Sequence, residues 1–487
     1  MSDTNPNLKI VIVGAGPGGI CMAIKLKQAG FDDFVILEKG TGLGGTWYHN
    51  RYPGCECDIP SHLYSFSFEV KPDWTKPYAR QPEILAYLQE CADKYELGPH
   101  FSFDSEVRKL DWSDETARWN IELATGATLE ANVVVSAIGM FNELVYPDIE
   151  GLGDYTGTSF HSARWNWDHD IQGATVGVIG SAASAVQFIP EIVKEAGQVY
   201  VFQRTANWVL PKEDEPYTEE QLEHFRQNPE VAQHIRDEIF TATDRGEAFK
   251  NPEERVKYEE AGRQAISVVE DPAVREKLTP THIWGCKRPL FANNYYETFN
   301  RPNIEVVTEG IERITASGVK TTDGTEREVD TLVLATGFDA TKYLSVLDVT
   351  GRDGVPIQEA WSDGAQAYRG ITTSGFPNLF MLYGPNINMG SLITMIEWQT
   401  VHILKHVERM ARDGLAWIDV KADPMRDYNA TIQEDIHEIE AWSSPTGCNT
   451  YYRAPSGRVV TQWPHTMRHY RDSIEHPEFD VYEVGRR

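Results

Sequence analysis

The chain has 487 residues, of which 41% are hydrophobic, and this is enough for two or three domains with sizeable cores. Its formal net charge of −28 argues against nucleic acid and anionic membranes as partners, because phosphate binding needs a basic face. The sequence has no run of about 18 apolar residues, so we expect no membrane-spanning helix. The polar first residues do not resemble a secretory signal, so we expect a cytoplasmic protein.

The chain opens with a short strand that leads into a glycine-rich turn. Residues 10–13 are apolar and mostly β-branched, and Gly14, Gly16 and Gly19 follow with the spacing of a dinucleotide-binding turn. In such a turn the first glycine bends the chain and the second lets the backbone approach a pyrophosphate. The third lets the next helix, expected over 20–28, pack against the strand.

A second strand is expected over 34–37, and it ends at Glu38. A carboxylate at this place binds the ribose hydroxyls of a dinucleotide. We include the neighbouring Lys39 in the same site. An ordinary strand-to-helix turn would not require the acid, so the combined pattern favours a dinucleotide site.

The next segment of the chain favours FAD over NAD as the first cofactor. A second glycine-rich loop over 42–48 carries Gly45, Thr46 and Trp47, and it suits the close approach of a large planar ring. Val107 ends a short segment on which an adenine could rest. A β-meander comes next, and a plain dehydrogenase domain does not need one.

A second dinucleotide-binding start begins with a strand over 175–179. Ala182 stands where the first copy has a glycine, which adds one methyl group near the pyrophosphate. Ala185 is acceptable where the helix packs on the strand. The residues that we assign to this turn are Gly180, Ser181, Ala182, Ser184 and Ala185.

The end of the next strand, expected over 199–202, favours NADPH as the second cofactor. Gln203, Arg204 and Thr205 follow this strand, and an arginine, not an acid, stands at the expected ribose position. An acid would repel a 2′-phosphate, whereas a guanidinium binds it in a bidentate manner. The alternative for Arg204 is a solvated arginine at a strand end.

The two copies predict the fold class: α/β, with two Rossmann-like three-layer domains and a helical insertion in the second. The insertion is rich in Glu, Gln, Arg and Ala, and it either covers the site or is a solvated decoration. The predicted domains are an FAD-binding domain at 1–145 and 338–487, an NADPH-binding domain at 146–211 and 279–337, and the insertion at 212–278.

The segment between the two copies carries a signature, Tyr155-x-Gly157-x-x-x-His161-x-x-x-Trp165-Asn166. With this signature the chain resembles the type I Baeyer–Villiger monooxygenases, a branch of the flavin-dependent class B monooxygenases. The family has Phe at the first position and Pro or Asp at the last, so Tyr155 and Asn166 are departures. The resemblance implies that His161 supports motion between steps from the interdomain linker, whereas alone it would more often be structural.

Two further segments resemble the family. Residues 44–58 resemble the loop whose final residue, Asp58, lies beside the flavin and nicotinamide, and Tyr64 lies in a run typical of the family. Residues 286–301 resemble the segment with the active-site arginine, which implies this role for Arg288. The resemblance further implies that Lys287 grips the 2′-phosphate together with Arg204 and Thr205, and that the loop with Asn386 and Met389 approaches the flavin. Residues 442–452 resemble a mobile loop, with a rigid surface loop as the alternative.

The resemblance implies a Baeyer–Villiger monooxygenase that uses FAD, NADPH and O₂ to convert ketones to esters or lactones through a C4a-peroxyflavin. Arg288 would stabilise the anion and Asp58 would hold the guanidinium, with no metal required. The enzyme would be a monomer or a weak homo-oligomer. One alternative is an N- or S-oxygenase of the same fold. A flavin disulfide reductase would need Cys-x-x-Cys, whereas Cys55 and Cys57 are separated by one residue. We expect all six cysteines to be structural thiols.

Overall fold

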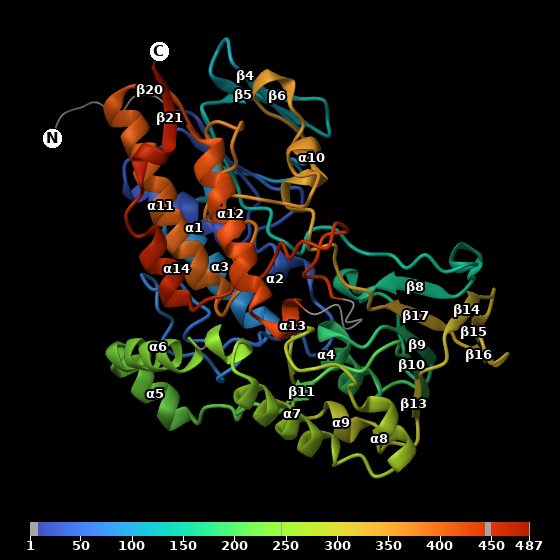
Figure 1. Cartoon of the computed structure of the whole chain (residues 1–487). Helices are drawn as coiled ribbons and strands as arrows, with labels where there is room; N and C mark the ends of the chain where they lie inside the picture. The colour runs from blue at the N-terminus through green and yellow to red at the C-terminus, as the bar shows by residue number, and fades with distance from the viewer. Residues whose placement is uncertain (1–7, 245, 444–449, 487) are drawn as a thin grey trace.

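The computed structural model of the chain describes residues 8–244, 246–443 and 450–486. It contains two units, each built on a five-stranded parallel sheet (Figure 1). Helices cover the sheets, and further helices occupy the insertion in the second unit. The predicted fold class is therefore confirmed. Residues 444–449, which form most of the loop expected at 442–452, lie outside the described residues.

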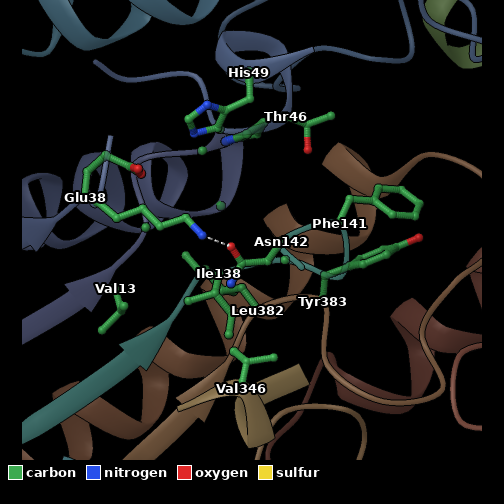
Figure 2. Close-up of a pocket in the computed structure, with 18 of the residues that line it drawn as sticks. Val13, Glu38, Thr46, His49, Ile138, Phe141, Asn142, Val346, Leu382 and Tyr383 are labelled. Atoms are coloured by element: carbon green, nitrogen blue, oxygen red, sulfur yellow. Dashed lines mark hydrogen bonds between the residues drawn. The ribbon is translucent and has the colours of Figure 1, made fainter. Parts of the chain in front are cut away.

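The first sheet has the order β19–β7–β1–β2–β3, with every neighbouring pair parallel. Its strands are β1 Ile10–Val13, β2 Phe34–Leu37, β3 Phe101–Ser102, β7 Val133–Ser136 and β19 Leu379–Met381. All four residues of β1 are buried, as expected for an apolar, β-branched strand between two parallel neighbours. The carboxyl ends of these strands open into a cavity (Figure 2).

The second sheet repeats this arrangement in the order β8–β17–β9–β10–β13. Its strands are β8 Thr158–His161, β9 Thr175–Ile179, β10 Gln198–Phe202, β13 Ile304–Val307 and β17 Thr331–Leu334. β9 and β10 correspond to β1 and β2, and in each pair a glycine turn follows the first strand. The edge strand differs in origin, because β8 precedes its unit's glycine turn whereas β19 comes from the last third of the chain.

Smaller sheets complete both units. In the first unit β4 Val107–Ser113, β5 Arg118–Leu123 and β6 Thr128–Ala131 form a meander, which β18 Asp348–Thr350 joins. In the second unit β14 Ile311–Ile314, β15 Gly318–Thr321 and β16 Glu326–Glu328 form the equivalent meander. Two pairs of strands remain, β11 Val209–Leu210 with β12 Leu290–Phe291, and β20 Leu415–Val420 with β21 Tyr482–Arg486.

Helices of the first unit pack around its sheet. They are α1 Pro17–Gln28, α2 Thr46–His49, α3 Gln81–Lys94, α10 Ile357–Ala360, α11 Leu392–Asp413, α12 Ala422–His437, α13 Glu440–Ser443 and α14 Met467–Ile474. α1 begins three residues earlier than the predicted Ile20, because Gly16 occupies the N-cap and Pro17 takes the first helical position.

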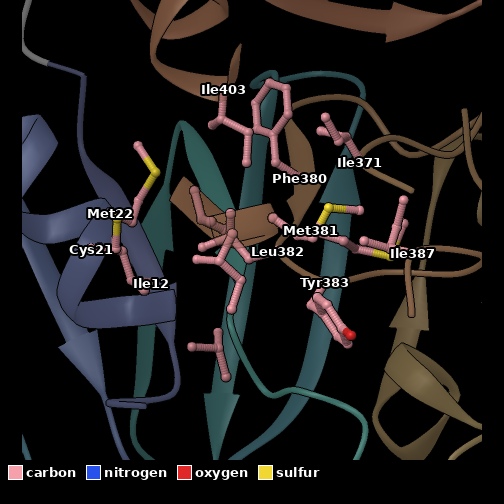
Figure 3. Close-up of a cluster of buried hydrophobic side chains, with 14 of the residues drawn as sticks. Ile12, Cys21, Met22, Ile371, Phe380, Met381, Leu382, Tyr383, Ile387 and Ile403 are labelled. Carbon is pink, nitrogen blue, oxygen red and sulfur yellow. The ribbon is translucent and has the colours of Figure 1, made fainter. Parts of the chain in front are cut away.

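The core of the first unit surrounds β19. Figure 3 shows Leu382 and Met381 at the centre, between Ile12 and Met22 on one side and Ile387 on the other. All five side chains are almost completely buried. Truncation of such a side chain to alanine typically costs about 2–5 kcal/mol of stability. The chain passes from this core directly to Tyr383, which lines the cavity.

The chain crosses between the units twice, and the two linkers pair with each other. Leu144 and Phe338 form an antiparallel bridge. The Val145 N–H donates to the Gly337 carbonyl at 3.0 Å, and the Asp339 N–H donates to the Glu143 carbonyl at 3.0 Å. The connection between the units is therefore a double strand.

The second unit carries α4 Ala183–Ile192 and α9 Tyr295–Thr298, and its insertion carries α5 Glu219–Gln227, α6 Pro229–Thr243, α7 Pro252–Ile266 and α8 Pro272–Leu278. α5 and α6 lie under the first unit, while α7, α8 and α9 stay with the second (Figure 1). Within the described ranges, no helix is long and apolar enough to cross a bilayer.

Candidate active site

A cavity of about 320 Å³ lies at the carboxyl ends of the first sheet, where ligands bind in open parallel sheets. The predicted site residues that line it are Gly14, Gly16, Glu38, Lys39, Gly45, Thr46, Trp47, Tyr64 and Val107. These residues come from segments up to about 90 positions apart, and the fold brings them to one place.

Two glycine loops meet at the base of this cavity. Gly14 has a φ of +107°, and a Cβ there would lie 2.6 Å from the Ala137 carbonyl oxygen. A Cβ on Gly45 would lie 2.8 Å from the Cα of Gly16, so the loops touch without side chains between them. No side chain caps the N-terminus of α1. Its free N–H groups therefore face the space that a phosphate would fill.

Gly19 has a packing role and does not line the cavity. A Cβ there would lie only 2.0 Å from the Gly14 carbonyl oxygen. The close approach of α1 to the turn therefore depends on this glycine, as the sequence predicted.

Glu38 is buried at the end of β2, and its carboxylate is already held by the backbone. The Ala15 N–H and the Gly40 N–H each donate to one of its oxygens at 2.8 Å. An ionised carboxylate has about four acceptor positions. The side chain is therefore fixed in place with acceptor capacity left for hydroxyl groups.

Cationic side chains gather on one side of the cavity. Lys39 donates to the Asn142 side-chain oxygen at 2.5 Å, which is the dashed line in Figure 2. Arg164 of the second unit also lines the cavity, and neither cation forms an ion pair with a carboxylate of the described residues. Burial lowers the pKa of His49 to about 4, and the nearby Arg164 and Lys39 act in the same direction. This side of the cavity suits an anion such as a phosphate.

The sequence interpretation did not include Arg164 as a site residue. It stands directly before Trp165 in the signature, which was the only signal that could have drawn attention to it. Its reach into the other unit's cavity depends on how the units dock, and local spacing carries no information about docking.

Aromatic side chains form another part of the wall. The Trp47 indole N–H donates to the Tyr64 hydroxyl at 3.1 Å, and the two rings meet edge to face. The Gln81 side chain donates to the Trp47 backbone carbonyl at 2.5 Å, which holds the backbone of this loop. In Figure 2, Tyr383 and Phe141 lie on the side away from Glu38.

Asp58 and Arg288 are 230 positions apart in the chain and form an ion pair. The Arg288 guanidinium donates to one Asp58 oxygen through Nη2 at 2.5 Å and through Nε at 3.1 Å. About a third of the Arg288 side chain and a quarter of the Asp58 side chain are exposed. The Asp58 carboxylate holds the pKa of Arg288 well above its usual value, so the guanidinium keeps its charge.

Tyrosines connect this ion pair to the cavity. Tyr383 lines the cavity, and burial raises its pKa while the nearby Arg288 charge opposes the rise. Tyr451 responds in the same way to burial and to Arg288, and its ring contacts that of Tyr452. Asp58 and Arg288 do not line the cavity themselves, but Tyr383, which does, lies within reach of the Arg288 charge. Tyr383 and Tyr451 were not among the predicted site residues.

The second glycine turn has the geometry of the first. Gly180 has a φ of +110°, and a Cβ there would lie 2.4 Å from the Ala335 carbonyl oxygen. α4 starts after Ala182 without a side-chain cap, and the Cβ of Ala185 is accommodated in the buried core. The Asn207 side chain donates to the Ser181 carbonyl at 2.9 Å and holds the turn against the segment that follows β10. Ser184 lies in the first turn of α4 and is half-buried.

Two cations stand near this second turn. Arg204 is exposed, and Lys287 is half-buried. Burial lowers the pKa of Lys287, and the positive charge of Arg204 lowers it further. The two positive charges therefore act on each other at this place. Thr205 lies beside Arg204, and its carbonyl accepts from the Ser181 hydroxyl at 3.4 Å.

The residue of the second sheet that corresponds to Glu38 lies one position earlier than the sequence suggested. The Glu38 N–H donates to the Ser102 carbonyl, and the equivalent bond in the second sheet runs from the Gln203 N–H to the Val307 carbonyl. Gln203 thus occupies the place of Glu38, and Arg204 comes directly after it. No acid stands at this place, as expected.

The signature residues lie at the edge of the second sheet. Gly157 has no room for a side chain, because a Cβ would lie 2.3 Å from the Tyr155 hydroxyl and 2.8 Å from the Asp330 carbonyl oxygen. The Tyr155 hydroxyl donates to the Val329 carbonyl at 2.8 Å. The Asn166 side chain accepts from the Asp168 N–H at 3.2 Å, which an Asp at this position could equally do. Both departures from the family pattern therefore have a local structural role.

His161 and Trp165 lie at the junction between the units. His161 is buried, and its Nδ1 accepts from the Ala163 N–H at 3.1 Å. Its ring packs against Tyr146 and Phe338 of the two linkers. Burial lowers the pKa of His161, so the neutral ring is favoured. Trp165 packs against Phe188 of α4.

Three further residues depart from what the sequence predicted: Asn386 and Met389, expected near the flavin, and Cys286, expected as a thiol. Asn386 is buried and donates to the Val459 and Gln462 carbonyls at 2.9 and 3.1 Å, so it braces a loop and does not line the cavity. Met389 packs against the core of the first unit. Cys286 is disulfide-bonded, so the expectation of six thiols is wrong at this position.

Comparison with known proteins agrees with this geometry. Residues 11–268 match the family of pyridine nucleotide-disulphide oxidoreductases. The chain is 42% identical to a Baeyer–Villiger monooxygenase of Pseudomonas aeruginosa, over 94% of this chain and 87% of that protein. It is 38% identical to a Baeyer–Villiger monooxygenase of Streptomyces coelicolor, over 99% of this chain and 93% of that protein.

Solved structures show the same arrangement. The crystal structure of OTEMO in complex with FAD and NADP superposes with a TM-score of 0.88 at 29% identity, covering 99% of this chain and 100% of that chain. The closed crystal structure of cyclohexanone monooxygenase superposes with a TM-score of 0.89 at 29% identity, covering 99% of each chain.

Proposed function

We propose, from the premise that this chain belongs to the family of Baeyer–Villiger monooxygenases, that it oxidises ketones to esters or lactones with FAD, NADPH and O₂. The observation that carries the proposal is the Arg288–Asp58 ion pair, which joins a cation of the second unit to the loop beside the first unit's cavity. The FAD and NADP in the OTEMO structure support the choice of cofactors.

The residues of the first unit fit FAD. The uncapped N-terminus of α1 and the close-packed loops at Gly16 and Gly45 leave space and N–H donors for a pyrophosphate. Glu38 would accept hydroxyl groups of a ribose, and Lys39 and Arg164 would face phosphate oxygens. Trp47 and Tyr64 supply an aromatic wall for a planar ring.

The second unit fits NADPH. α4 has an uncapped N-terminus after Gly180, which suits the pyrophosphate. Arg204 and Lys287 supply two neighbouring positive charges for a 2′-phosphate, and Gln203 does not repel it. The cost of bringing two cations together is offset when a dianionic phosphate binds between them.

When bound, the reduced flavin supplies the electrons that activate O₂. Arg288 presents a permanent charge and N–H donors toward the oxyanion formed on the carbonyl under attack, and one such preorganised donor contributes about 3 kcal/mol. Asp58 holds the guanidinium in a fixed orientation, so little reorganisation is needed during the reaction. The tyrosines beside the pair cover it in part, and a third of the Arg288 side chain remains accessible.

The test is product analysis on the purified enzyme. We expect NADPH oxidation that depends on O₂ and on added cyclic or aromatic ketones, with one ester or lactone formed per NADPH. Oxidation of amines or sulfides without ketone turnover would favour the alternative N- or S-oxygenase. Stoichiometric hydrogen peroxide in place of ester would contradict both.

We extend the proposal to organisation and location. The domains are 1–145 with 338–487 for FAD, 146–211 with 279–337 for NADPH, and 212–278 for the insertion; each sheet draws its strands from one of the first two sets. We place the enzyme in the cytoplasm as a monomer or weak homo-oligomer, which fractionation and light scattering would test. Cys21, Cys55, Cys57 and Cys91 are free thiols, as expected in a reducing compartment, whereas the disulfide at Cys286 is a bond that an oxidising compartment favours.

A further inference from the structure

Arg236 is a buried arginine of α6 in the helical insertion. Only 5% of the residue is exposed. Its Nη1 donates to the carbonyls of His62, Leu63 and Ser65 at 2.9, 3.0 and 2.8 Å, and Nη2 lies 3.4 Å from the Thr394 hydroxyl. An insertion that belongs to the second unit in sequence thus reaches into the first unit.

The charge of Arg236 is compensated by dipoles. Its hydrogen-bond partners among the described residues are carbonyl and hydroxyl oxygens, and no carboxylate there forms an ion pair with it. Burial lowers the pKa of Arg236, and the Glu397 carboxylate of α11 opposes this at longer range. Burying an arginine is costly unless its donors are satisfied. Loss of the guanidinium would therefore leave several carbonyls of one short loop without a donor.

That loop, residues 62–65, carries part of the cavity wall. Tyr64 lies between the carbonyls that Arg236 binds, and its hydroxyl accepts from the Trp47 indole. Both side chains line the cavity. The position of Tyr64 therefore depends on the conformation that the guanidinium fixes.

The second contact of Arg236 leads to another part of the same wall. The Thr394 hydroxyl, in the first turn of α11, donates to the N-cap Ser391 hydroxyl at 3.1 Å, and Ser391 donates to the Leu63 carbonyl at 3.2 Å. Leu392 and Ile396 of this helix line the cavity. One guanidinium thus connects the insertion, the loop and the start of α11.

A second, apolar contact holds the same loop. The His62 ring packs edge to face against Tyr217 and against Phe225 of α5. Burial and the nearby Arg236 both lower the pKa of His62, so the neutral ring is favoured in this contact. Two helices of the insertion therefore act on loop 62–65.

We propose that Arg236 is a positioning residue through which the helical insertion sets the flavin-side wall of the cavity. The insertion is then neither a solvated decoration nor only a cover, because it fixes the loop that presents Tyr64. The part of this proposal that concerns FAD rests on the proposed function. The part that concerns the order of loop 62–65 does not.

Hydrogen exchange and cofactor titration test the proposal on Arg236→Met, Arg236→Lys and the parent protein. The matched control is Arg255→Met. Arg255 also ties the insertion to the first unit, through an ion pair of 2.6 Å with the exposed Glu440, but it does not line the cavity. Exchange of residues 60–68 is measured in the cofactor-free protein, and FAD affinity is measured from the quenching of flavin fluorescence.

For Arg236→Met we expect exchange of 60–68 to rise at least tenfold and FAD affinity to fall about tenfold. Arg236→Lys keeps the charge and one donor group, so we expect smaller changes of about threefold in both. Arg255→Met should leave both at the parent values even where it lowers the thermal midpoint.

Unchanged exchange in 60–68 for Arg236→Met would overturn the proposal. Should that variant fail to fold, Arg236→Lys decides in the same way. Equal effects from Arg255→Met would also overturn it, because general loosening of the insertion would then be the cause. A parent protein that binds no FAD would contradict the proposed function, while the exchange result would still decide the role of Arg236.

Discussion

The two glycine turns of this chain share one backbone conformation but lead into different surroundings. At Gly14 and Gly180 the φ angles are +107° and +110°, and in both turns the missing Cβ would collide with the carbonyl oxygen of an alanine at the end of the neighbouring strand. Both helices begin without a side-chain cap. The shared part is the part that receives a pyrophosphate.

The difference lies at the end of the next strand. Glu38 is fixed by two backbone N–H groups, whereas Gln203 in the same place donates to the Lys277 carbonyl at 2.8 Å. Gly16 also meets a second glycine loop at Gly45, and the second turn has Ala182 instead. The turn therefore determines that a dinucleotide binds, whereas the strand end and the facing glycine loop determine which dinucleotide it is.

Replacement of Arg288 gives the largest expected effect, because this residue of the second unit acts on the chemistry beside the first unit's cavity. Arg288→Ala should lower ester formation about 10²–10³-fold, because the developing oxyanion loses its charged donor. Reduction by NADPH should remain largely intact, since the Gly180 turn is untouched. Rapid kinetics of reduction, with product analysis in parallel, measure the two separately. Normal ester yield from this variant would contradict the assignment, and Arg288→Lys should lie between the two.

Alanine at the two turns tests whether they are separable. Gly14→Ala forces a methyl group against the Ala137 carbonyl oxygen at positive φ, so FAD affinity should fall by about 10- to 100-fold. Gly180→Ala should leave the FAD content at the parent level and slow reduction by NADPH to a similar extent. The bound flavin per chain and the reduction rate report the two effects. Loss of FAD from Gly180→Ala would mean that the turns are not independent.

The strand-end difference predicts cofactor preference. Arg204→Glu should remove a preference for NADPH over NADH of about 10- to 100-fold, because a charged partner of the 2′-phosphate is replaced by a repelling one. Gln203→Glu rebuilds the Glu38 arrangement and should improve the use of NADH. The ratio of kcat/KM for the two nucleotides is the measurement. Equal rates with both nucleotides in the parent enzyme would contradict the role of Arg204.

The smallest effects concern two aspartates with opposite pH behaviour. Burial raises the pKa of Asp419 in the first unit to about 7, so its stabilising contribution is full below about pH 4 and is lost as the pH rises through 7. In the second unit, hydrogen bonds from Thr321 and Thr325 lower the pKa of the exposed Asp323 to about 2. Its contribution is present above about pH 4 and is lost as the pH falls through 2.

Thermal midpoints across the pH range test this contrast. Asp419→Asn should raise the midpoint relative to the parent at pH 8 and leave it unchanged at pH 4, because asparagine resembles the protonated acid. Asp323→Asn should lower the midpoint slightly between pH 5 and 8. Parallel profiles for the two variants would show that the two groups do not titrate as described.

Much of the fold can be predicted from local pattern. β1, β2 and β9 have the predicted bounds, because short apolar runs rich in β-branched residues before glycine turns favour buried parallel strands. The start of α1 was wrong by three residues, because Pro17 is a good first residue of a helix and not a break before it. Glu38 was found from its spacing alone, since a carboxylate at a strand end has few other roles.

The rest of the site depends on contacts that spacing does not encode. Asp58 and Arg288 were identified through family resemblance, because nothing in the local pattern pairs residues 230 positions apart. Arg164 reaches the cavity because of how the units dock, and Tyr383 reaches it because β19, from late in the chain, joins the first sheet. Arg236 looks like one more charged residue on a helix of the insertion. The position of Gln203 depends on strand register, which the sequence left undetermined by one residue.

The origin of the edge strands has a consequence for synthesis on the ribosome. Every strand of the second sheet has been made once residue 334 has emerged, whereas the first sheet waits for β19 at 379–381. The sheet that begins at the N-terminus is therefore the last to be completed. Its glycine turn must keep its conformation while the second sheet forms. At about 5–20 residues per second, β7 stays without its neighbour β19 for roughly 12 to 50 seconds, and during this time its edge is open to other chains.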